Sequence, residues 1–114
     1  MGVRMKQTRL ESFKKYFTQY QKRFGLEGYS VYFQQCVLSD CHADITTDHY
    51  NMLATVRVNS TGSEGRKLKD TAKHEALHLL LGEIMYLARN RYISEDILYS
   101  AEEQIVYKLE KLID

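Results

Sequence analysis

Two histidines and a glutamate in one predicted helix are the residues best suited to chemistry. His74, Glu75 and His78 stand in the pattern H-E-x-x-H. Because residues four apart lie on one face of a helix, His74 and His78 can present two imidazole nitrogens to one metal ion. Zinc fits such a pair, lowers the pKa of a coordinated water and polarises a carbonyl. Glu75 is then placed to act as the general base and to pass the proton to the leaving amine.

The alternative is that these three residues have no role in metal binding and are ordinary residues of a packed helix. His74 and His78 would then be partly buried histidines, and Glu75 would lie at the surface. We favour the metal site, because the surrounding segment is rich in leucine and unpartnered histidines would be costly to bury there. The sequence therefore predicts one zinc ion per chain.

A catalytic zinc site needs a third protein ligand. The metzincin pattern would need glycine at position 81 and histidine at position 84, where this chain has Leu81 and Ile84. The other two histidines of the chain lie upstream, in the region predicted to form strands. We therefore expect a carboxylate from the last predicted helix, where Glu102 and Glu103 are the candidates. The helical period favours Glu102, because it falls nearer the apolar stripe.

A helix and three strands are predicted upstream of the motif. Thr8 to Glu11 resembles a capping box, apolar residues then recur at three- and four-residue steps, and Gly25 is suited to end the helix. From Tyr29 to Val58 the period changes to two, with strands near 29–36, 42–47 and 51–59. Short links between these strands favour hairpins and an antiparallel meander.

The motif itself lies in a predicted helix over about 67–89, and Ser94 caps a last helix. That helix carries a predicted core stripe of Leu98, Ala101, Ile105, Leu109 and Leu112. The order of helix, three strands, helix and helix predicts an α+β fold in a single domain over residues 1–114.

At this point the chain resembles the small zincin-like metallopeptidases of phage and bacterial genomes, which are minimal gluzincin relatives akin to SprT-like domains. The resemblance rests on TAKHEALHLLLG, on the upstream meander and on SAEEQIVYKLEKLI. It implies zinc held by His74, His78 and a glutamate of the last helix, with Glu75 catalytic. It also implies that a peptide or protein substrate docks along the third strand, Asn51 to Asn59.

The chain departs from the larger gluzincins, because it has no N-E-x-x-S-D stretch in its last helix. A residue that stabilises the oxyanion is also needed. The sequence leaves that choice open among Arg89, Arg91, Tyr92, Tyr99 and Tyr107.

Charge is distributed unevenly along the chain. Residues 1–25 hold seven Lys or Arg against Glu11 alone, a net charge of +6, so the remainder carries −5 of the overall +1. Such a basic helix can contact nucleic acid or an acidic partner, which gives the alternative of a non-catalytic binding module on a zincin scaffold. The start of the chain has no apolar stretch typical of a secretory signal, and no run is long enough to span a bilayer. The sequence therefore predicts a cytoplasmic protein that does not contact membranes.

Overall fold

The computed structural model describes residues 2–37, 42–60, 67–89 and 94–114, with side chains from residue 9 onward. Its class is α+β, as predicted from the sequence. The elements, in chain order, are α1 (Gly2–Arg23), β1 (Ser30–Cys36), β2 (Ala43–Asp48), β3 (Leu53–Asn59), α2 (Leu68–Leu80), α3 (Gly82–Ala88) and α4 (Glu95–Leu112). No helix in these ranges is both long enough and apolar enough to cross a bilayer.

The three strands form a mixed sheet in the order β1-β3-β2. β3 is antiparallel to β2, as the predicted hairpin requires, but parallel to β1. The prediction of an antiparallel meander is therefore wrong. Alternating side chains tell which face of a strand is buried, but not which strands are neighbours. Three residues of β3, Ala54, Val56 and Val58, are no more than 1% exposed. β3 is the central strand of the sheet, where such residues are best shielded from water.

This strand order also bears on the prediction of a substrate-docking edge at residues 51–59. β3 has a hydrogen-bonded neighbour on each side, so it has no free edge for an added strand. The strand that stands at the edge beside the H-E-x-x-H helix is β2, which packs against α2.

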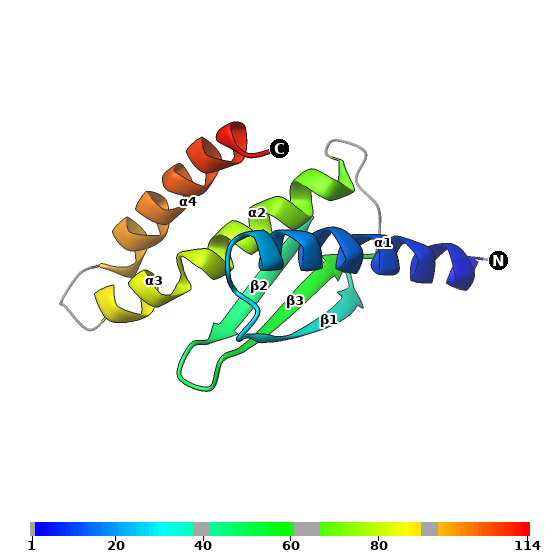
Figure 1. Ribbon diagram of the computed structural model, residues 1–114, viewed down its shortest axis with the longest axis horizontal. Coiled ribbons are helices and arrows are strands. Elements are labelled where there is room, and N and C mark those ends of the chain that lie inside the picture. Colours follow the sequence, from blue (N-terminus) through cyan, green and yellow to red (C-terminus); the bar gives the residue numbers. More distant parts are fainter. Residues whose placement is uncertain (1, 38–41, 61–66, 90–93) are drawn as a thin grey trace.

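One face of the sheet is covered by α1 and α2, which together make a two-layer body (Figure 1). One alternate set of residues along β2 and β3 is buried, with Ala43, Ala54, Val56 and Val58 in the core. The helices contribute apolar residues that repeat at helical spacing. These are Phe13, Phe17 and Tyr20 from α1, and Ala72, Ala76 and Leu79 from α2. Phe33 of β1 packs edge-on against both phenylalanines of α1, with ring centroids 6.2 and 5.4 Å apart.

Helix boundaries differ from the sequence prediction in two places. α1 begins at Gly2 rather than at Thr8, because favourable helix formers continue upstream of the capping pattern. It ends at Arg23, and Gly25 takes the left-handed conformation (φ 72°) that was predicted for it. The single helix predicted over 67–89 is divided into α2 and α3 at Leu81, where glycine, a weak helix former, follows.

α4 lies outside the two-layer body and packs against α2 and α3 (Figure 1). Its buried residues are Glu102 and Val106. The predicted core stripe is therefore wrong, since Ile105 is 46% exposed and Leu112 is 81% exposed. α4 is rotated so that its glutamates, rather than its larger apolar side chains, face α2.

Candidate metal centre

Two imidazole rings converge at the middle of α2. His74 and His78 are one helical turn apart, and their Nε2 atoms are 3.2 Å from each other. Two nitrogens bound to one tetrahedral zinc at about 2.0–2.1 Å would lie about 3.3 Å apart. The pair therefore has the spacing expected of two ligands of one ion.

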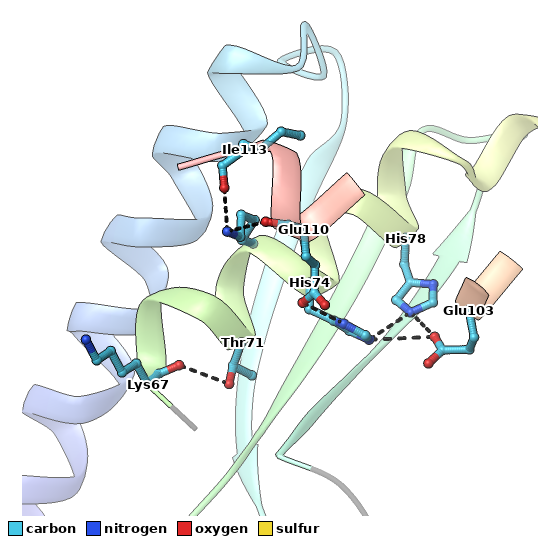
Figure 2. Close-up of polar contacts among 8 residues, drawn as sticks. Lys67, Thr71, His74, His78, Glu103, Glu110 and Ile113 are labelled. Atoms are coloured by element: carbon cyan, nitrogen blue, oxygen red, sulfur yellow. Dashed lines mark hydrogen bonds and ion pairs between the residues drawn. The ribbon is translucent and has the colours of Figure 1, made fainter. Parts of the chain in front are cut away.

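Glu103 of α4 supplies a third donor to the same point (Figure 2). Its Oε1 atom lies 2.5 Å from Nε2 of His78 and 3.6 Å from Nε2 of His74. His74, His78 and Glu103 form a cluster whose donor atoms all lie within 4.8 Å of one another. The Glu103 side chain is 40% exposed, so this side of the cluster is open to solvent.

Each ring is held from behind by a different carboxylate. Nδ1 of His78 lies 2.9 Å from Oε2 of Glu102, and Nδ1 of His74 lies 3.0 Å from Oε2 of Glu110. Both carboxylates are nearly buried, with 8% and 9% of the side chain exposed. Carboxylates in this position typically fix the orientation and tautomer of a metal-binding imidazole.

The predicted third ligand therefore differs from the residue that the structure brings to the two Nε2 atoms. The sequence favoured Glu102, which is indeed the more buried of the two candidates. Glu102 contacts the rear nitrogen of His78, whereas Glu103, at the flank of α4, faces the converging nitrogens. The more buried glutamate is therefore not the one whose carboxylate lies closest to the two Nε2 atoms.

The arrangement of donors and acceptors calls for a cation. Ionised carboxylates only accept hydrogen bonds, so Nδ1 of each neutral ring must carry the hydrogen. Both Nε2 atoms then present lone pairs to each other and to an oxygen of Glu103. Three acceptors at one point repel one another unless a positive charge lies between them. A zinc ion, with nitrogen and carboxylate ligands, satisfies this requirement.

The surroundings shift the pKa values of the two histidines in opposite directions. Burial and the neighbouring His78 lower the pKa of His74 below its usual value, and they outweigh Glu110 and Glu103. Burial also lowers the pKa of His78, but the hydrogen bond to Glu102 and the charges of Glu75, Glu102 and Glu103 outweigh it and raise that pKa. Of the two rings, His78 is therefore the one whose protonated form is favoured.

Glu75 lies in α2, next in sequence to His74. It is 5% exposed and, with both histidines and Glu103, lines a cleft of about 630 Å³. The walls of this cleft come from β2, α2, α3 and α4, and include all of 42–47 and the residue Arg89 after α3. The role of general base predicted for Glu75 stays a prediction.

Several predicted residues are in the cleft but not in the cluster. His42 and His49 line it near the two ends of β2. Of the oxyanion candidates, Arg89, Tyr99 and Tyr107 line the cleft, and Nη2 of Arg89 donates to the Tyr99 hydroxyl at 2.8 Å. Arg91 and Tyr92 lie outside the described residues.

The basic first helix lies away from these cleft residues, and part of its charge is used within the fold. Lys14 stands over the ring of Phe33, 5.7 Å from its centroid. Arg23 donates to the backbone oxygen of Asp114 at 3.2 Å. Contact of this helix with nucleic acid or an acidic partner stays a prediction.

Sequence reasoning missed Glu110 and gave no role to Lys73. A signal for Glu110 was present, because it follows Glu103 by seven residues and thus lies on nearly the same face of α4. Comparisons of this chain with protein-family models, with curated proteins and with solved structures found no match.

Proposed function

We propose that this protein is a zinc-dependent peptidase in which His74, His78 and Glu103 hold the metal. The convergence of two Nε2 atoms and one carboxylate oxygen, with a separate carboxylate behind each ring, carries the proposal. When bound, zinc supplies Lewis acidity, which polarises a substrate carbonyl and makes water a better nucleophile at neutral pH.

Glu75 performs the proton transfers in this proposal. It takes a proton from the attacking water as oxygen adds to the carbonyl carbon of the scissile amide. It then gives that proton to the amide nitrogen as the C–N bond breaks, so that a carboxylic acid and an amine are released. Its burial beside the histidines keeps its carboxylate close to the reacting atoms.

The edge strand β2 is the element best placed to bind the peptide. The oxygen of His42 accepts a hydrogen bond from the backbone N–H of Asn59, so alternate residues from His42 onward direct their backbone groups at β3. The backbone groups of Ala43, Ile45 and Thr47 therefore point away from β3, on the side of an edge strand where an extended peptide can add. All three residues line the cleft that holds Glu75.

The proposal is tested by metal analysis followed by a hydrolysis assay. Protein purified without chelator should contain about one zinc ion per chain. Glu75→Gln should keep the zinc and lose hydrolysis of a fluorogenic peptide library, whereas His78→Ala should lose both. Glu27→Gln, at an exposed glutamate in the turn after α1, is the matched control and should behave as the unmodified protein. Absence of zinc from both the unmodified protein and Glu75→Gln would refute the proposal.

A further inference from the structure

Lys73, the residue before the first histidine, is a buried cation that the proposed reaction does not use. Only 7% of it is exposed. Its Nζ donates to the backbone oxygen of Glu110 at 2.8 Å and to that of Ile113 at 2.5 Å. A buried ammonium group is costly unless hydrogen bonds compensate for its lost hydration, so these two contacts are structurally important.

The two carbonyl groups lie at the C-terminal end of α4. The last carbonyls of a helix have no partner within it, and they carry the negative end of the helix dipole. A lysine is suited to this position for both reasons. Here the capping charge comes from another helix, so it also joins α4 to α2.

Glu110 is held at two points by two consecutive residues of α2. Its backbone oxygen accepts from Nζ of Lys73, and its side chain lies 3.0 Å from Nδ1 of His74. The contact with Lys73 therefore sets the position of Glu110 along α2. Since α4 is a continuous helix, it also sets where Glu103, two turns earlier, meets the histidines.

Apolar packing contributes little to fixing α4 in place. Its only buried apolar residue is Val106, so burial of apolar surface contributes less here than in the body. Two contacts from α1 help to hold the end of the chain after α4. The Tyr20 hydroxyl donates to the backbone oxygen of Asp114 at 2.6 Å, and Arg23 donates to the same oxygen.

We propose that Lys73 is a positioning residue, which clamps the C-terminal end of α4 against α2 and so brings Glu103 and Glu110 to the two histidines. This inference rests on the proposed metal site, although Lys73 touches neither the metal donors nor the substrate. Metal affinity should accordingly depend on Lys73, because residues that orient metal ligands affect affinity without binding the ion.

Cobalt binding measures the effect on the site. Lys73→Met keeps the length of the side chain but removes its charge and donors, and it should weaken Co²⁺ binding about tenfold or more, as followed by visible absorption. Lys73→Arg keeps charge and donors and should recover part of the affinity. Lys69→Met, at an exposed lysine of the same helix, is the matched control and should bind Co²⁺ as the unmodified protein does.

Hydrogen exchange in the metal-free protein tests the clamp independently of any metal. In chelator, Lys73→Met should speed exchange of the amides in α4 about tenfold, while amides of α2 and β3 stay protected. A purely structural role would instead lower protection throughout. If Lys73→Met does not fold, Tyr20→Phe can be used instead. It removes the hydroxyl that donates a hydrogen bond to the backbone oxygen of Asp114 and keeps the ring. It should also speed hydrogen exchange of the amides in α4.

The two measurements separate the two proposals. No cobalt binding by the unmodified protein would contradict the metal site, whereas faster exchange confined to α4 would still support the clamp. Equal cobalt affinity and equal α4 exchange in Lys73→Met and Lys69→Met would overturn the inference about Lys73.

Discussion

The body of the molecule and α4 are held in place by different forces. In the body, made of α1, the sheet and α2, aromatic and aliphatic side chains of α1 and β3 are almost completely excluded from water. α4 instead offers Val106 and a row of glutamates, and its contacts with α2 are ion pairs and hydrogen bonds to His74, His78 and Lys73. The fold of the body should therefore be independent of metal, whereas the docking of α4 should depend on it.

The largest expected effect comes from truncating a buried side chain in the core of the body. Phe17→Ala should lower the free energy of unfolding by about 3–5 kcal/mol, because it leaves a cavity at a fully buried ring. Val106→Ala should cost less, about 2 kcal/mol, because fewer buried atoms are lost. Urea unfolding followed by circular dichroism, in chelator, measures both.

Cobalt affinity should show the reverse order for these two variants. Phe17→Ala should bind Co²⁺ normally under conditions in which it is folded. Val106→Ala should bind Co²⁺ more weakly, because Val106 is the buried apolar residue of α4, the helix that carries the glutamates. Equal losses of affinity in the two variants would mean that the body and α4 are one cooperative unit.

The next effect distinguishes Glu102, Glu103 and Glu110, the glutamates of α4 that lie beside the two histidines. Glu103→Gln removes a direct donor and should weaken zinc binding by more than about 100-fold. Glu102→Gln and Glu110→Gln remove supports of the rings and should each weaken it about 10- to 100-fold. Competition with a chromophoric chelator gives the three affinities, with Glu95→Gln at the exposed start of α4 as the control. If Glu102→Gln were the most damaging, Glu102 rather than Glu103 would be the third ligand.

The smallest effect is the separation of two histidine titrations. In metal-free protein, His78 should titrate above the ordinary value of 6.5 and His74 below it, as NMR of the imidazole resonances can measure. Protonation of His78 then adds to the free energy of unfolding at acidic pH, and this contribution is lost as pH rises through the raised pKa of His78. The contribution of His74 has the opposite sign, and stability is lost as pH falls below 6.5 towards its lowered pKa.

Zinc should abolish both titrations over this range, because a metal-bound imidazole nitrogen cannot take up a proton. Two histidines that still titrate in protein saturated with zinc would contradict the assignment of His74 and His78 as ligands.

The sequence by itself determined the features that depend on local periodicity. Residues four apart on a helix must share a face, so His74 and His78 were paired before any fold was known. The alternation of Ala54, Val56 and Val58 fixed the buried face of the third strand for the same reason. The positive φ of Gly25 followed from the residue type at a helix end.

Only the tertiary structure decided which strands are neighbours and how α4 is rotated. The order β1-β3-β2 depends on which strand gains most from burial on both sides, and the period of two contains no information on that. The rotation of α4 was predicted from its apolar residues, yet Ile105 is half exposed while Glu102 is buried. Glu102, Glu103 and Glu110 each contact at least one of the two histidines of α2. Partners from a distant segment thus determined which glutamate faces the two Nε2 atoms.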